Sequence, residues 1–157
     1  MTRLRGRALR GRRLHAKAPA GHWQTTTMIS SMRLDGTTAC MTVNAATDSA
    51  IFRVYVQEVL VPTLRPGDIV VLDNLSPHKS EETLALIRAA GAAVQFLPAY
   101  SPDLNPIEKM WSKVKNSLRS DEARTEEDLQ TAIAAALQKV TAQDAAHWFV
   151  SCGYSFI

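Results

Sequence analysis

The chain has 157 residues, about the size of one domain and enough to bury a core. Apolar residues make up 46% and charged residues 21%, and no run approaches the roughly 20 apolar residues that a membrane span requires. The basic N-terminus is not followed by the apolar segment of a secretion signal, so we expect a cytoplasmic protein. Cys40 and Cys152 lie far apart, without metal-ligand spacing, and are predicted to be small core residues.

The net charge of +3 is distributed unevenly along the chain. Residues 1–17 carry seven basic residues and no acid, whereas the rest of the chain carries 11 basic and 15 acidic residues. The basic residues are Arg3, Arg5, Arg7, Arg10, Arg12, Arg13 and Lys17. This pattern favours contact between residues 1–22, which we call the basic arm, and a polyanion. A solvated tail is the alternative.

The first regular structure is predicted to be a β-hairpin. Residues 23–34 are rich in β-branched and apolar side chains, and an Asp-Gly pair, which favours a tight turn, opens the segment 35–43. Between residues 47 and 64, apolar side chains recur at helical spacing, with Thr47 or Asp48 as the N-cap. We therefore expect a helix after the hairpin.

A β-α-β unit is predicted next. Residues 69–72 are continuously apolar, which is typical of a strand covered on both faces, so we expect it to lie centrally in the sheet. Residues 79–91 predict a helix that ends at Gly91, and residues 92–98 predict a second strand. Because crossover connections are right-handed, the two strands should be parallel.

The last third of the chain is predicted to be helical. Residues 105–120 place apolar side chains on one face, and Trp111 and Trp148 are assigned to the core by their registers. Residues 125–140 and 141–149 each open with Thr and an acid three residues later, as in a capping box. The whole pattern predicts one α/β domain over residues 1–157, with a mixed sheet flanked by helices.

Two carboxylates stand at positions where chemistry is expected. Asp73 follows the apolar strand, and the carboxyl ends of strands are where open α/β sheets place ligands. Glu108 lies near the start of the helix 105–120. Each has a local alternative: Asp73 would cap the next turn, and Glu108 would complete a capping box with Asn105.

Taken together, the two carboxylates indicate a metal site. A divalent metal takes hard oxygen ligands from separate elements, and two-metal phosphoryl transfer needs such ligands to converge. Lys113 and Lys115 lie near Glu108 along the helix, which suits a phosphodiester, although a solvated helix face explains them equally well. His78 and Lys79, expected at the start of the helix after Asp73, are predicted phosphate neighbours. A surface histidine is the alternative for His78.

Several motifs resemble the catalytic domain of mariner-like and bacterial insertion-sequence transposases of the DDE superfamily. The motifs are "VVLDNLSPHKS", "FLPAYSPDLNPIEKMWSKVK" and the closing "CGY". The most specific is the run from Tyr100 to Glu108, and the 34 residues between Asp73 and Glu108 also match this family. The segment "RLRGRALRGRR" and the following "GHWQTTT" resemble the family's sequence just after its first catalytic Asp.

The resemblance implies an RNase H-like fold in which Asp73 and Glu108 are the second and third metal ligands. It implies two Mg²⁺ or Mn²⁺ ions, DNA at transposon ends and at the target as substrate, and a bacterial protein associated with the nucleoid. A missing strand would leave an unpaired sheet edge, so we also expect a homodimer. The implied reaction is metal-dependent cleavage of DNA followed by strand transfer.

The chain departs from this family at its N-terminus. The family's first catalytic Asp lies on the first strand of the sheet, and this chain is expected to begin after that strand. Asp35 and Asp48 do not replace it, because turn and N-cap positions explain them. We therefore expect an N-terminally truncated domain whose first Asp comes from an upstream part, and the activity of the fragment alone stays an open question.

Two other functions remain open. The first is a non-catalytic DNA-binding remnant of a transposase that acts through the basic arm. The second is an unrelated metal-dependent phosphohydrolase, which would usually carry a second acid near Asp73 or a glycine-rich phosphate loop, and the sequence has neither.

Overall fold

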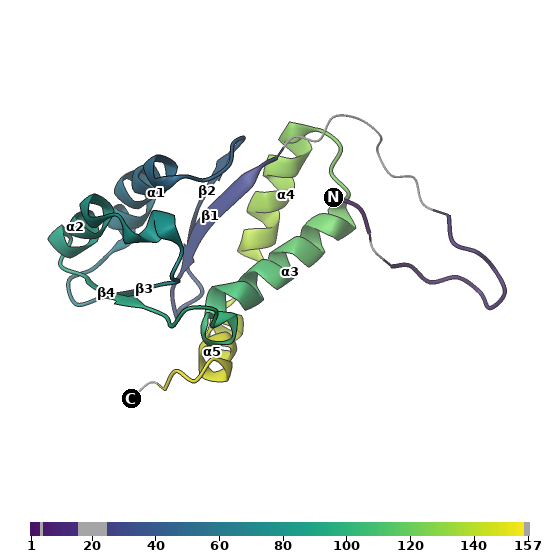
Figure 1. The fold of residues 1–157 in the computed structure, drawn as a ribbon. Coiled ribbons are helices and arrows are strands. Elements are labelled where there is room, and N and C mark those ends of the chain that lie inside the picture. Colours follow the sequence, from purple (N-terminus) through teal and green to yellow (C-terminus); the bar gives the residue numbers. More distant parts are fainter. Residues whose placement is uncertain (4, 16–24, 156–157) are drawn as a thin grey trace.

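A computed structural model describes residues 1–3, 5–15 and 25–155 of the chain. A β-hairpin lies in the middle of the molecule, with the helices of the first half on one side and the C-terminal helices on the other, and residues 5–15 extend away from the body (Figure 1). The strands and α-helices are β1 (Thr27–Met32), β2 (Thr38–Val43), α1 (Ser49–Tyr55), β3 (Ile69–Leu72), α2 (Glu81–Ala89), β4 (Ala93–Phe96), α3 (Pro106–Asp121), α4 (Glu126–Gln138) and α5 (Ala142–Ser151).

The predicted hairpin is confirmed: β1 and β2 pair antiparallel. Asp35 and Gly36 form its turn, and Oδ1 of Asp35 accepts a hydrogen bond from the Thr37 N–H at 2.9 Å. Gly36 has a φ of +83°, and a Cβ at this position would lie 2.7 Å from the backbone of Thr141 and Ala142. Glycine is therefore required for the turn's conformation and for its close approach to the start of α5.

The helix predicted over residues 47–64 is present but irregular. Asp48 is its N-cap, and Oδ1 of Asp48 accepts a hydrogen bond from the Ile51 N–H at 2.8 Å. After α1 the helix widens to π geometry over Val56–Leu60 and then tightens to a 3₁₀ turn over Val61–Thr63. The 3₁₀ turn contains a proline, which has no N–H to continue the hydrogen-bond ladder.

The β-α-β unit is confirmed, but the predicted central position of its first strand is wrong. β3 pairs in parallel with β4, and the structure places these two strands in a sheet of their own, apart from the hairpin. Among the described residues, β4 is the only strand paired with β3. Ile69, at the start of β3, is 62% exposed, so the apolar run 69–72 is not covered along its whole length. The mixed α/β architecture therefore consists of two small sheets.

The three C-terminal helices are confirmed, and one predicted capping box is incomplete. At α5, the Thr141 hydroxyl accepts a bond from the Asp144 N–H, and the Asp144 carboxylate accepts one from the Thr141 N–H, as a full box requires. At α4, the Thr125 hydroxyl accepts a bond from the Asp128 N–H, but the return bond from the Thr125 N–H to the Asp128 carboxylate is absent. Half of the predicted motif is therefore present there.

Two hydrophobic cores lie on opposite faces of the hairpin. One is built on α3 and α4, and Met28 and Met32 of β1 pack against it. The other is built on α1 and its irregular continuation, and Ile29 of β1 and Met41 of β2 pack against that one. Because successive side chains of a strand point to opposite faces, one short strand contributes to both cores. Trp111 and Trp148 join the first core as predicted, and Cys152 is buried, while Cys40 is only half-buried.

An ion pair joins the two sheets. Arg33, just after β1, donates two hydrogen bonds to Asp68, just before β3, at 2.6 and 2.8 Å. Both side chains are largely shielded, with 26% and 21% of their surfaces exposed. Such two-pronged pairs fix geometry better than a single ion pair does. The end of the hairpin is therefore held at the start of β3.

No helix within the described residues is long and apolar enough to cross a membrane.

We predict that Asp68→Asn makes stability less dependent on pH. The bonds from the Arg33 side chain and the Arg65 N–H lower the pKa of Asp68 to about 2. A carboxyl in an unfolded chain titrates near pH 3.9, so this contribution is complete above that value and is lost as the pH falls towards 2. The variant should be less stable by about 1–2 kcal/mol at pH 6, and the difference should vanish near pH 2.

Urea unfolding at a series of pH values measures this difference. Glu127→Gln, which removes an exposed acid that forms no ion pair with any described residue, serves as the control for the loss of one negative charge. A difference between native and Asp68→Asn protein that stays constant from pH 6 to pH 2 would contradict the prediction.

Candidate active site

Asp73 lies directly after β3, at the carboxyl end of the small parallel sheet. Its side chain is 36% exposed, and Oδ1 accepts a hydrogen bond from the Leu75 N–H at 3.1 Å. The predicted turn-capping role is therefore real. It occupies one carboxylate oxygen and leaves Oδ2 without a hydrogen-bond partner in the described part of the chain.

His78 is the neighbour of Asp73. Its Nδ1 lies 2.6 Å from Oδ1 of Asp73, although no aligned hydrogen bond forms between them. Its ring packs on Phe52 of α1, with the ring centroids 4.2 Å apart, and 19% of its side chain is exposed. His78 is thus a half-buried residue that supports the Asp73 carboxylate, rather than the surface histidine of the alternative interpretation.

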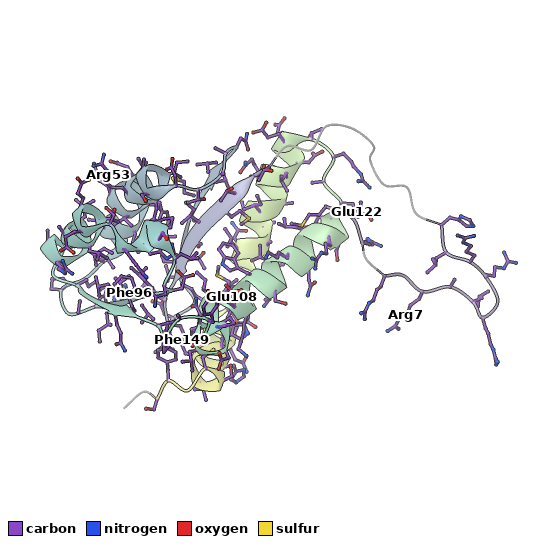
Figure 2. The ribbon with its side chains drawn as sticks, in the orientation of Figure 1. Arg7, Arg53, Phe96, Glu108, Glu122 and Phe149 are labelled. Carbon is purple, nitrogen blue, oxygen red and sulfur yellow. The ribbon has the colours of Figure 1, made fainter. Side chains whose placement is uncertain are left out.

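Glu108 lies in the first turn of α3 and is exposed (Figure 2). Asn105 and Pro106 occupy the N-cap and first-turn positions as expected, but the Asn105 side chain makes no capping bond. The Glu108 carboxylate likewise has no hydrogen bond or ion pair with any described residue. The capping-box explanation of Glu108 is therefore wrong, which leaves both of its oxygens available to a ligand.

The parallel pairing of β3 and β4 brings Asp73 beside the start of the connection that leads to Glu108. Leu72 pairs with Phe96, and the next residue along β4, Leu97, donates its N–H to the carbonyl of Leu72 at 2.8 Å. Asp73 therefore starts one connection, and Leu97 starts the neighbouring connection that leads to Glu108. The sequence indicated this shared edge through the β-α-β pattern.

Asp73 and Glu108 provide the type of oxygen atom that a hard divalent metal binds, but too few of these atoms for a complete site. Free carboxylate oxygens of Asp73 and Glu108 are the ligands that Mg²⁺ and Mn²⁺ prefer. Among residues 1–3, 5–15 and 25–155, however, no group of three or more Asp, Glu, His or Cys side chains is placed to hold a metal ion. Two carboxylates are the most that these residues contribute.

The predicted phosphate contacts near the carboxylates differ in their availability. His78 and Lys79 end a 3₁₀ turn, and α2 begins only at Glu81, so they do not stand at the start of that helix as expected. Lys79 and Lys115 are exposed and have no acidic partner among the described residues. The ammonium of Lys113 forms an ion pair with Asp144 instead.

That ion pair is structural. Lys113 on α3 and the capping-box bonds of α5 share the Asp144 carboxylate, and together they lower the pKa of Asp144 to about 2, Lys113 being the largest cause. The pair fastens the start of α5 to α3, so Lys113 is already committed to the fold.

The basic arm is anchored at one residue. Arg3 donates to the Ser120 carbonyl at 3.1 Å and lies near the Glu122 carboxylate, at the end of α3 far from Glu108. The other arginines described in the basic arm are exposed, and their side chains have no partner in the described part of the chain. They are Arg5, Arg7, Arg10, Arg12 and Arg13. Figure 2 shows Arg7 on the loop, away from the body. Lys17, and also His22 and Trp23, lie outside the described residues.

One positioning residue could not be assigned from the sequence. The Tyr154 hydroxyl donates to the Leu104 carbonyl at 3.1 Å, just before the N-cap of α3, and its ring packs edge-on against Phe149. The "CGY" motif signalled the residue without indicating its role. The C-terminal segment thus holds the turn that presents Glu108.

The comparison with known proteins agrees with this geometry. The model of the family described as DDE superfamily endonuclease matches residues 1–130. The chain therefore belongs to the DDE superfamily of endonucleases, whose fold is RNase H-like. Membership implies transposase-type nuclease activity, DNA as substrate and, as is general in this superfamily, divalent metals. No curated protein matches the chain.

We predict that Tyr154→Phe loosens the turn before Glu108. Removing the hydroxyl deletes the bond to Leu104, so unfolding should become easier by about 0.5–1.5 kcal/mol, and amide exchange over residues 101–105 should accelerate. Urea unfolding and hydrogen exchange measure the two effects.

Tyr55→Phe is the matched control, because it removes a hydroxyl bonded at 3.0 Å to the Ala39 carbonyl in another part of the fold. It should cost similar stability without changing exchange over residues 101–105. If exchange there is also unchanged in Tyr154→Phe, the assigned positioning role is incorrect.

Proposed function

We propose that this chain is the catalytic part of a transposase that cuts DNA at the ends of a bacterial insertion sequence and joins them to target DNA. The observation that carries the proposal is the free carboxylate of Glu108, which has no local structural role and ends the connection that leaves the sheet edge beside Asp73. An unpaired carboxylate at the carboxyl edge of a parallel sheet is typical of a ligand site.

In this proposal, Asp73 and Glu108 hold Mg²⁺ or Mn²⁺. Bound metal would supply activation of the attacking hydroxyl and stabilisation of the leaving oxygen. His78 keeps the Asp73 carboxylate in place through its contact with Oδ1, and Tyr154 fixes the turn before α3. Lys79 and Lys115, exposed and unpaired among the described residues, bind the phosphates that flank the cleaved bond.

The proposed site needs a third carboxylate from outside the described residues. Asp35 and Asp48 do not supply it, because no group of three acidic, histidine or cysteine side chains within the described residues is placed to hold a metal ion. The resemblance points to the first strand of the family's sheet as the element that carries this carboxylate. We propose that the protein acts in the cytoplasm, on DNA of the nucleoid.

We predict that the folded chain binds Mn²⁺ through Asp73 and Glu108. In calorimetric titration, Asp73→Asn and Glu108→Gln should each weaken binding by tenfold or more, because each removes a charged ligand and leaves the shape of the side chain unchanged. Asp103→Asn, which changes an exposed acid in the same connection, should bind like native protein. Equal binding by all four proteins, or none by folded native chain, would contradict the proposal.

A non-catalytic DNA-binding remnant is the second candidate. It is favoured by the five arginines of the basic arm that are exposed and unpaired among the described residues, and by the lack of a three-ligand group within the same residues. In this case DNA binding would depend on salt and on the arginines, and would be unchanged in Asp73→Asn and Glu108→Gln. Metal titration and DNA binding of the same variants therefore separate the two functions.

We also propose that the chain forms a homodimer. β3 has one hydrogen-bonded neighbour among the described residues, and a strand edge with unpaired amides and carbonyls is a template for a second chain. Light scattering should give at least twice the mass of one chain. A well-behaved monomer at the same concentration would count against the dimer.

A further inference from the structure

Tyr100 combines an unfavourable backbone conformation with complete exposure. Its φ is +58°, in the left-handed region that bulky residues rarely adopt and where turns normally place Gly or Asn. Its surface is 99% exposed, and its hydroxyl has no hydrogen-bond partner in the described part of the chain. Packing therefore does not compensate for the strain. A strained residue that the fold does not use is a candidate for function.

The position of Tyr100 places it beside the candidate active site. The Leu97 N–H is bonded to the Leu72 carbonyl, directly before Asp73, and Tyr100 follows three residues later. Three residues span at most about 11 Å, so Tyr100 lies at the edge of the sheet that carries Asp73. The same connection continues into α3 and Glu108.

The surroundings of Tyr100 suit a strand of nucleic acid. In the connection that follows β3, Leu75 is 58% exposed. Lys79, in the connection that follows β3, and Lys109, in the first turn of α3, are exposed and have no acidic partner among the described residues. Exposed rings next to unpaired cations characterise surfaces that bind single strands, because the ring stacks on a base while the cations contact phosphates.

We propose that Tyr100 is a base-stacking residue, whose ring takes the face of an unpaired nucleobase of the DNA strand held at the Asp73–Glu108 edge. This inference rests on the proposed function, which identifies the ligand as DNA, but it does not require bound metal. The left-handed backbone of Tyr100 projects the ring out of the protein, where a base released from its duplex stack can reach it.

The test compares three variants with native protein in the presence of a chelator. Tyr100→Phe keeps the ring, and Tyr100→Asn removes it but tolerates the left-handed backbone. Val150→Ala, which trims a 60% exposed side chain on α5, is the control for the loss of exposed apolar surface. Fluorescence anisotropy measures binding to a labelled single strand, to its duplex, and to an abasic strand of equal length. Thermal unfolding reports the stability of each protein.

We expect Tyr100→Asn to bind the single strand about fivefold or more weakly, and Tyr100→Phe and Val150→Ala to bind within twofold of native protein. The abasic strand should bind native protein and Tyr100→Asn equally. The melting temperature of Tyr100→Asn should equal or exceed the native value, because Asn suits the backbone better and no packing is lost.

Three results would overturn the inference: equal binding of the single strand by native protein and Tyr100→Asn, an equal loss with the abasic strand, or a lowered melting temperature of Tyr100→Asn. Because the chelator removes metal, failure here leaves the Mn²⁺ titration as an independent test of catalysis. Conversely, absent Mn²⁺ binding together with Tyr100-dependent DNA binding would contradict the catalytic proposal alone.

Discussion

The fold depends on the β1–β2 hairpin, because both hydrophobic cores pack against it. Met28 and Met32 face the core on α3 and α4, whereas Ile29 faces the core on α1, so one strand stabilises both halves of the molecule. Neither core is large, and a strand buried on both faces contributes apolar surface to each. A shift of one residue in the register of β1 would exchange these faces, which makes the turn at Gly36 the feature that fixes the arrangement.

The candidate site depends on the hairpin indirectly. The bidentate contact between Arg33 and Asp68 sets the start of β3, and the pairing of β3 with β4 then carries Asp73 and Leu97 to the same edge. α3 is positioned at its beginning by Tyr154 and along its length by the core and by the contact of Lys113 with Asp144. The two carboxylates thus come from elements held by different contacts, so the site is sensitive to both halves of the fold.

Local signals in the sequence predicted the elements and the shared edge well. The Asp-Gly turn, the N-cap of α1 and the parallel β-α-β unit follow from turn chemistry and from the period of the apolar residues. The central position predicted for β3 was wrong because a continuous apolar run says nothing of which strands lie beside it. The capping box at Glu108 was wrong because residue types at the right spacing do not guarantee that their side chains turn back to the helix. The role of Tyr154 and the left-handed Tyr100 depend on contacts or dihedral angles that no pattern encodes.

The contact of Arg3 ties the start of the basic arm to the end of α3. Arg3 is fastened near the end of α3, and the 16 residues of that helix span about 24 Å from there towards Glu108. The five described arginines beyond the anchor lie within ten residues of Arg3, so the chain limits how far they can move from that end of the helix. One helical turn of DNA, about 34 Å, is longer than α3. A duplex bound at the carboxylate edge would therefore have these tethered arginines nearby at a high effective concentration.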